Sequence, residues 1–278
     1  MIVPTLRYER RLWQEGAVRV VGVDEVGVAP TCGAVVAAAV IIRPNARKVP
    51  GVRDSKTLSA LQRERLVGLV RAKAVAVGVG AASVREIDRL NIYHATHLAM
   101  RRAIARIGEH DHVLVDGRRI VGFEAEVGPY TAIVDGDALC YSIACASIVA
   151  KVTRDRMMSR LAARYPEYGW QHNQGYSSRE HRRALFEHGV TPHHRRSFLT
   201  VQAALAGRQE AFDLFGEAAA GSGATGSEDE DVDGEAPVSA STGDGDAGSE
   251  LDLAALAGDP DAREPSADEL VALVGEPG

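Results

Sequence analysis

The sequence contains few cysteines, and none is paired in a motif. Its 278 residues include Cys32, Cys140 and Cys145, none of which forms a C-x-x-C pair. This spacing excludes a disulfide framework and a zinc knuckle, so we expect reduced cysteines and a cytoplasmic protein. The apolar stretch at 35–42 is too short to cross a bilayer, and the N-terminus lacks the apolar core of a signal peptide.

The charge is distributed unevenly along the chain. Residues 1–208 contain 31 Lys and Arg against 19 Asp and Glu, whereas residues 209–278 contain one Arg against 19 acids. A basic body suits an enzyme that acts on a phosphate polymer, although an ordinary soluble protein can also have a basic surface. The acidic segment has too few apolar groups to offset its ordering entropy. We therefore expect a catalytic domain at 1–208 and a disordered tail at 209–278.

Two short segments of the tail suggest partners. The run E-D-E-D-V-D-G-E at 228–235 is a candidate competitor for nucleic acid on the basic body, or a solubilising segment. Just before it, A-F-D-L-F at 211–215 is similar to peptides that dock on replication sliding clamps. Packing of Phe212 and Phe215 on the body would explain that segment equally well.

Hydrophobic periodicity predicts an α/β protein. We expect strands at 18–24, 33–43, 74–79, 112–116 and 131–134, and helices at 5–15, 58–73, 142–164 and 179–188. Ser83 and Glu86 have the spacing of a capping box, which places a further helix start at that point.

Acidic residues occur at three of the predicted strand ends. Asp24 and Glu25 end the first strand, Asp116 precedes Gly117, and Asp137 follows another apolar run. Strand ends of an open α/β sheet hold functional groups rigidly while leaving them reachable. Each acid alone is also consistent with a simple acidic turn. Carboxylates converging in one place suit Mg²⁺ or Mn²⁺, because hard cations prefer oxygen ligands.

Six segments of the sequence, in order, resemble the ribonuclease HII family. They are V-G-V-D-E-V-G-V-A-P (21–30), D-S-K-T-L-S (54–59), V-L-V-D-G (113–117), G-D-A-L-C-Y-S-I-A-C-A-S-I-V-A-K-V-T-R-D (136–155), N-Q-G-Y-S-S (173–178) and H-R-R-S-F (194–198). The resemblance implies a ribonuclease H-like mixed five-stranded sheet flanked by helices, with a helical C-terminal part. It also implies that Asp24, Glu25, Asp116 and Asp137 are catalytic and bind two divalent ions, Mg²⁺ or Mn²⁺.

The same resemblance implies an endonuclease. Members of the ribonuclease HII family hydrolyse the RNA strand of RNA–DNA hybrids and incise 5′ of ribonucleotides embedded in duplex DNA, leaving a 3′-hydroxyl and a 5′-phosphate. We expect this chain to do so as a monomer, by a two-metal mechanism. The resemblance further assigns nucleic-acid contacts to six residues, namely Gly27, Lys56, Lys151, Tyr176, Arg195 and Arg196.

The chain departs from the family in the motif that follows the acidic pair. Where G-R-G is usual, it has Gly27-Val28-Ala29, and lysines common in the family are replaced by Thr57, Asp135 and Gln174. Because these changes remove positive charge, they predict a weaker hold on phosphate. We expect the adjacent histidines His193 and His194, which precede two arginines, to face phosphate or to fix the loop.

Two other functions are consistent with parts of the sequence. A ribonuclease H-like protein that binds hybrids but cleaves them weakly or not at all would fit the altered G-R-G motif. An α/β enzyme acting on small phosphorylated substrates would use the same metals, but the sequence lacks a glycine-rich phosphate loop.

Overall fold

A single mixed sheet organises the fold. The computed structural model describes residues 3–44 and 46–207. Five strands lie in the order β3-β2-β1-β4-β5. Their bounds are β1 (Val20–Val26), β2 (Val35–Ile42), β3 (Ala74–Ala82), β4 (His112–Asp116) and β5 (Tyr130–Ile133). The first three strands pair antiparallel, whereas β1, β4 and β5 run parallel, so the carboxyl ends of these three meet at one edge.

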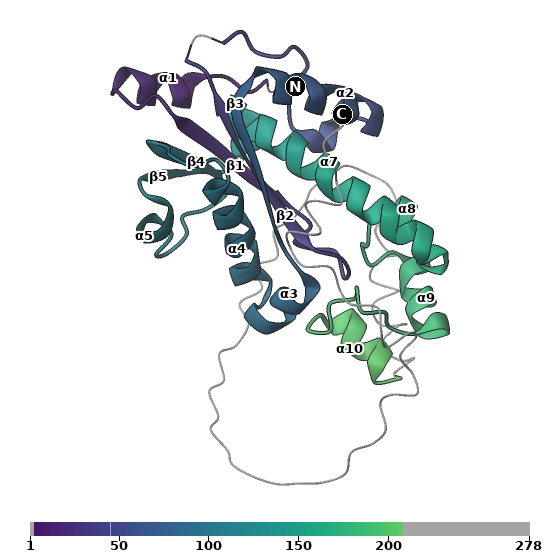
Figure 1. Cartoon of the computed structure of the whole chain (residues 1–278). Helices are drawn as coiled ribbons and strands as arrows, with labels where there is room; N and C mark the ends of the chain where they lie inside the picture. Colours follow the sequence, from purple (N-terminus) through teal and green to yellow (C-terminus); the bar gives the residue numbers. More distant parts are fainter. Residues whose placement is uncertain (1–2, 45, 208–278) are drawn as a thin grey trace, which may run out of the picture.

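Helices cover both faces of the sheet and extend beyond it (Figure 1). The α-helices are α1 (Arg7–Gln14), α2 (Ala60–Lys73), α3 (Val84–Leu90), α4 (Ile92–Ala105), α5 (Glu124–Val127), α6 (Gly136–Leu139), α7 (Tyr141–Arg164), α8 (Trp170–Asn173), α9 (Arg179–His188) and α10 (Leu199–Leu205). Two 3₁₀ turns, η1 (Ser55–Thr57) and η2 (Pro166–Tyr168), complete the elements.

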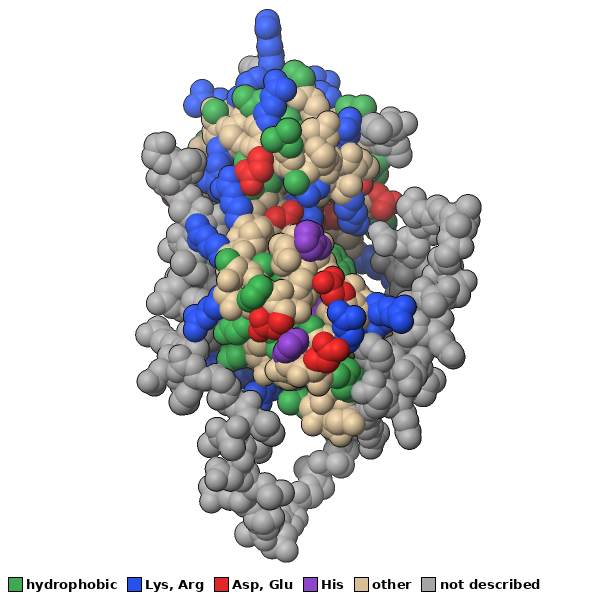
Figure 2. Space-filling model, turned by 90° about the vertical axis from the view of Figure 1, so that its right-hand side faces the viewer, with side chains coloured by type: hydrophobic (Ala, Val, Ile, Leu, Met, Phe, Trp, Pro, Cys, Tyr) green, Lys and Arg blue, Asp and Glu red, His purple; other side chains and the backbone are tan. Residues whose placement is uncertain are grey.

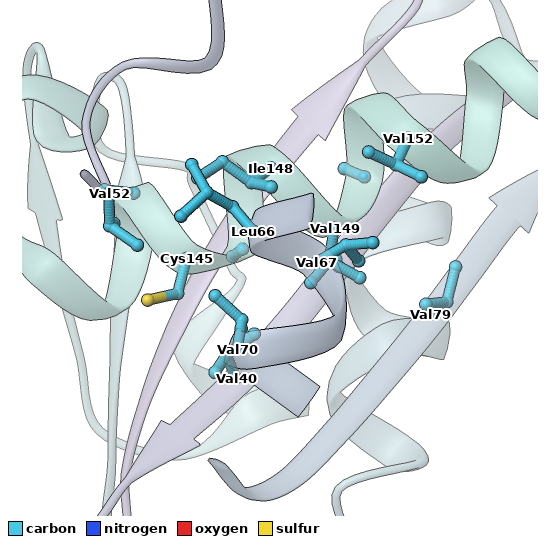
Figure 3. Close-up of a cluster of buried hydrophobic side chains, with 14 of the residues drawn as sticks. Val40, Val52, Leu66, Val67, Val70, Val79, Cys145, Ile148, Val149 and Val152 are labelled. Atoms are coloured by element: carbon cyan, nitrogen blue, oxygen red, sulfur yellow. The ribbon is translucent and has the colours of Figure 1, made fainter. Parts of the chain in front are cut away.

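Strand β2 is buried on both faces because its side chains alternate between two cores. Val36, Ala38 and Val40 pack with α2 and α7, and Figure 3 shows Val40 among the apolar side chains of those helices. Val35 and the alternating residues after it pack with α4 on the opposite face. The apolar run that the sequence shows at this point is therefore a central strand between two helical layers.

Small residues let α7 lie close to the sheet. A Cβ at Gly22 of β1 would lie 2.3 Å from the carbonyl carbon of Ser142 in α7. The far end of α7 leads into a C-terminal part, α8 to α10, which has its own cluster of buried residues around Trp170, Tyr168 and Leu185 (Figure 1). The mixed five-stranded sheet and the helical C-terminal part confirm the predicted fold.

The predicted elements lie where expected, with small differences at their ends. The helix expected at 58–73 begins at Ala60, because the Ser59 side chain caps it by accepting from the Gln62 N–H. The predicted capping box of Ser83 and Glu86 is present. The predicted tail, with its candidate competitor run and clamp peptide, lies outside the described residues.

Candidate active site

Two of the predicted acids lie at the carboxyl ends of neighbouring parallel strands. Asp24 is near the end of β1, and Asp116 is the last residue of β4. Because side chains alternate along β1, and Val23 packs on the α4 side, Asp24 faces α7 while Glu25 faces the other side. The Glu25 backbone N–H donates to Asp24 Oδ1 over 2.7 Å, which fixes that carboxylate.

The third acid, Asp137, lies next to Asp116 because a glycine precedes it. Asp116 Oδ1 accepts from the N–H of Gly136, at 2.7 Å, and from that of Gly117. A Cβ at Gly136 would lie 3.0 Å from that oxygen and 2.7 Å from the Ile143 side chain. The glycine therefore allows α6 to approach β4, and Asp137 in the first turn of α6 comes within reach of Asp116.

Asp24, Asp116 and Asp137 each offer a carboxylate oxygen, and these oxygens all lie within 4.8 Å of one another. Glu25 lies outside this group of three, and its Oε2 is buried without a hydrogen-bond partner. Hereafter the four residues together are called the carboxylate cluster.

Burial and mutual repulsion raise the pKa values of the carboxylates in this cluster. Burial, then the charges of Glu25 and Asp116, hold the pKa of Asp24 well above its usual range. Burial and Asp116 raise the pKa of Glu25 to about 7, and burial, Asp116 and Asp54 raise that of Asp137 to about 6. Burial likewise raises the pKa of Asp116. A divalent cation would relieve this repulsion, and four carboxylates supply the hard oxygen ligands that it prefers.

The turn around η1 brings further polar groups to the cluster. Lys56 is exposed, and its charge favours ionisation of Glu25, Asp116 and Asp137. Asp54 lies close enough to Asp137 for its charge to raise the pKa of that carboxyl, and it was not among the predicted site residues. The quoted D-S-K-T-L-S segment contained this signal, since Asp54 is its first residue.

A serine on α7 links that turn to the carboxylate cluster and was also missed. The Ser147 hydroxyl lies close enough to Asp24 to lower the pKa of that carboxylate, and it lies 2.8 Å from the hydroxyl of Ser55 in η1. This buried pair connects α7, β1 and the Lys56 turn, and a serine inside a helix gives no sequence signal of such a contact.

The predicted nucleic-acid contacts differ in exposure. Tyr176 is 46% exposed and Arg196 is exposed, whereas Lys151 is partly buried and forms a 2.8 Å ion pair with Asp155. On the face shown in Figure 2, acidic and basic side chains are interspersed, so this face presents no uniform basic track.

Arg195 was predicted to contact nucleic acid directly, but the structure places it in the interior. Its side chain is 0% exposed and donates to the carbonyls of Gly27, Val28 and Gly33. Because a guanidinium with these partners does not reach the surface, Arg195 acts on the turn at 27–29 rather than on a phosphate. The prediction for this residue is corrected accordingly.

The histidine pair fixes the loop, which was one of the two expectations. His194 Nδ1 accepts from the Thr191 N–H, and its Nε2 lies 3.0 Å from His181 Nε2. His181 Nε2 also accepts from the Trp170 indole N–H, which places the proton of His181 on Nδ1, where it donates to the Tyr176 carbonyl. Burial lowers the pKa of both His181 and His194, so they remain neutral.

Comparison with known proteins identifies the relationship. Residues 21–201 match the family model described as Ribonuclease HII. The chain is 54% identical over 197 residues to Ribonuclease HII of Thermosynechococcus vestitus, covering 70% of this chain and 90% of that protein. It is 50% identical over 204 residues to Ribonuclease HII of Ruegeria pomeroyi, covering 72% and 85%. The chain belongs to the ribonuclease HII family.

Solved structures of this family have the same fold. The chain is similar to the ribonuclease H2 of Pyrococcus horikoshii, with a TM-score of 0.59 and 26% identity over 70% of this chain and 99% of that one. It is also similar to the structure of the PCNA:RNase HII complex from Archaeoglobus fulgidus, with a TM-score of 0.58, 26% identity and coverage of 70% and 100%.

Family membership confirms the predicted class of enzyme. As a ribonuclease HII, the chain is a divalent-metal-dependent endonuclease that hydrolyses the RNA of RNA–DNA hybrids. Among residues 3–44 and 46–207, no helix has both the length and the apolar character needed to cross a bilayer.

Proposed function

We propose that the chain cleaves on the 5′ side of ribonucleotides, both in RNA–DNA hybrids and where a single ribonucleotide is embedded in duplex DNA. The products are a 3′-hydroxyl and a 5′-phosphate. The observation that carries this proposal is the group of three carboxylates within 4.8 Å at the edge of the sheet. It lies close to Lys56, and the exposed Tyr176 suits contact with a nucleotide.

The four acids of the carboxylate cluster would hold two divalent ions, Mg²⁺ or Mn²⁺. The raised pKa values of Glu25 and Asp137 and the unpartnered Glu25 Oε2 support this assignment, because a cation would stabilise the charged forms. When bound, such ions lower the pKa of a water molecule and stabilise the negative charge on the leaving oxygen.

The other residues bind and orient the substrate. Lys56 balances negative charge next to the carboxylate cluster, and Ser147 holds Asp24 in place. Tyr176 stacks on a sugar beside the cleavage site, Gly27 lets the backbone approach the ribose, and Arg196 and Lys151 attract the phosphate backbone. Lys151 can reach a phosphate only when its ion pair with Asp155 opens.

Cleavage of two labelled substrates tests the proposal. One is duplex DNA with a single ribonucleotide, the other an RNA strand paired with DNA, each with Mg²⁺ or Mn²⁺ and with Asp24→Asn as the inactive control. We expect incision 5′ to the single ribonucleotide by the wild type only. Cleavage of the long hybrid alone would refute the embedded-ribonucleotide activity. Binding without cleavage of either substrate would instead identify a hybrid-binding protein.

A sliding clamp is a further proposed partner, through the segment Phe212–Phe215, which lies outside the described residues. The Archaeoglobus fulgidus RNase HII has been solved in a complex with PCNA, which favours this proposal. A 206–218 peptide should bind a clamp, and the same peptide with both phenylalanines replaced by alanine should not. Equal binding by the two peptides would refute the assignment.

The proposed setting is the cytoplasm, where the chain acts as a monomer. All of its cysteines are free and buried, which suits a reducing compartment. Sedimentation of the full chain at micromolar concentration should give the mass of one chain, and a dimer would contradict the proposal.

A further inference from the structure

Two buried arginines lie side by side beneath the turn that follows the acidic pair. Arg154 of α7 is 1% exposed and Arg195 is 0% exposed. Neither forms a salt bridge with any carboxylate in the described part of the chain. Burial lowers the pKa of both, and in Arg195 the charge of Arg154 adds to the effect, yet a guanidinium remains protonated at neutral pH.

Backbone carbonyls replace the missing counter-ions. Arg195 donates to Gly27 at 2.5 Å, to Val28 at 2.8 Å and to Gly33 at 3.0 Å. Arg154 donates to the carbonyls of Cys32, Ala34 and Gln174, at 3.0 to 3.2 Å. Each of the six guanidinium nitrogens thus donates to one carbonyl, and the five carbonyls that belong to residues 27–34 hold this turn from below.

The contacts of Arg195 determine which way the neighbouring N–H groups point. In a trans peptide the C=O of one residue and the N–H of the next point in opposite directions, and the described chain has no cis peptide. With the carbonyls of Gly27 and Val28 directed at Arg195, the N–H groups of Val28 and Ala29 point away from it. Both residues are exposed, and within the described chain neither N–H has an acceptor.

Arg154 fixes the same turn against the loop that carries Tyr176. Through the Gln174 carbonyl it holds a residue two positions before that tyrosine, and the Thr31 N–H donates to the Gly175 carbonyl at 2.9 Å. Gly27 has a φ of +92°, and a Cβ there would lie 2.2 Å from Arg154 Nε. Gly27 is therefore required by backbone conformation and by the buried arginine together.

We propose that Arg195 is a positioning residue for ribose recognition. By holding the carbonyls of Gly27 and Val28, it presents the N–H groups of Val28 and Ala29 as a pair of donors for the 2′-hydroxyl oxygen of the ribonucleotide. This inference rests on the proposed function and adds to it the side chain that orients the backbone. Hydrogen bonds from a charged donor to those carbonyls also polarise the peptides, which strengthens their N–H groups as donors.

The role of Arg195 predicts what the change from the usual G-R-G to Gly27-Val28-Ala29 does to substrate binding. Because Arg195 holds this turn through backbone carbonyl oxygens, the orientation of the two N–H groups does not depend on the side chain at position 28. Replacement of the usual arginine by Val28 therefore weakens binding to phosphate and leaves the discrimination between ribose and deoxyribose intact.

The test measures discrimination between two duplexes by Arg195→Lys in the full chain. Affinity is measured for a duplex with one ribonucleotide and for the same sequence in DNA, with Ca²⁺ in place of the catalytic ion and product formation checked in each sample. Lysine keeps the charge but cannot hold consecutive carbonyls together. We expect the ratio of the two affinities to fall about tenfold, the effect of one misdirected hydrogen bond, while affinity for DNA changes little.

Two further variants separate positioning from folding. Arg102→Lys removes a guanidinium that donates to the Ala81 carbonyl and pairs with Glu86, and it should leave the ratio unchanged. Ala29→Pro deletes one of the two N–H donors with Arg195 intact and should lower the ratio as Arg195→Lys does. Thermal unfolding shows that each variant is folded.

The outcomes distinguish this inference from the proposed function. A parallel loss of both affinities in Arg195→Lys, or an unchanged ratio in Arg195→Lys and Ala29→Pro, would overturn the role of Arg195. Failure of the wild type to cleave either substrate would refute the proposed function instead.

Discussion

The carboxylate cluster and the arginine pair both bury like charges, but every guanidinium nitrogen of the arginines has a hydrogen-bond partner, whereas one carboxylate oxygen of the cluster has none. Six backbone carbonyls satisfy Arg154 and Arg195. The carboxylate cluster has Lys56 nearby, yet the pKa of Glu25 is still raised to about 7, and one of its oxygens has no partner. The protein therefore supplies hydrogen-bond partners to the arginines and leaves part of the carboxylate cluster without them.

This difference separates residues that build the site from residues that meet the substrate. A buried charge whose hydrogen bonds are made to backbone groups stabilises a loop conformation and is held away from a ligand. A buried charge without such bonds requires an external partner. The comparison predicts that changing the two regions will have opposite effects on stability and on activity.

Removal of a carboxylate from the cluster should have the largest effect. We expect Asp116→Asn to lower kcat about a thousandfold, or about 4 kcal/mol, because one oxygen ligand of the proposed ions is lost. The same change should raise the melting temperature of the metal-free protein, since it removes a repulsive charge. Asp111→Asn, at an exposed acid that accepts from the Val18 and Arg19 N–H groups, is the control and should retain full activity.

The stabilisation by added Mn²⁺ should depend on pH. Native Glu25 and Asp137, with pKa values of about 7 and about 6, hold protons that the unfolded chain has released. Stability from these groups is therefore complete below about pH 4 and is lost as the pH rises through 7.

A bound cation replaces those protons, so the rise in melting temperature on adding Mn²⁺ should grow between about pH 5 and pH 7.5. The difference between samples with and without Mn²⁺ cancels the opposite trend of buried histidines such as His193, whose pKa burial lowers to about 4. A constant difference across this range would contradict the assignment of the ions to these carboxylates.

Loss of the serine that holds Asp24 should have a moderate effect. Ser147→Ala removes the hydroxyl that lowers the pKa of Asp24 and the hydrogen bond to Ser55, so we expect kcat/KM to fall about tenfold, with the pH profile of kcat displaced upward as the pKa of Asp24 rises further. Ser159→Ala is the matched control on the same helix, since that hydroxyl is exposed and donates to the Asp155 carbonyl. Equal kinetics of the two variants would show that Ser147 does not position Asp24.

Restoring the family's arginine at position 28 should have the smallest effect. We expect Val28→Arg to add one phosphate contact, which steepens the dependence of log affinity on log salt by about 1 and leaves ribose discrimination unchanged. Val18→Arg, two residues before the start of β1, adds the same charge at an exposed apolar position and should leave the slope unaltered. Increased discrimination in Val28→Arg would show that the side chain, and not the backbone, reads the ribose.

The sequence by itself determined the helices, the strands and the acids at strand ends, and the family resemblance implied the mixed sheet. Apolar strand segments, the capping box at Ser83 and acids at strand ends are local patterns, and neighbours along the chain set them. The tertiary structure decided the partners of each side chain. It separated Glu25 from the other three acids, brought Ser147 and Asp54 to the carboxylate cluster, and buried Arg195 beneath Val28. Contacts between residues more than a hundred positions apart, such as Arg195 with Gly27, depend on packing of the whole domain, and no pattern within one segment encodes them.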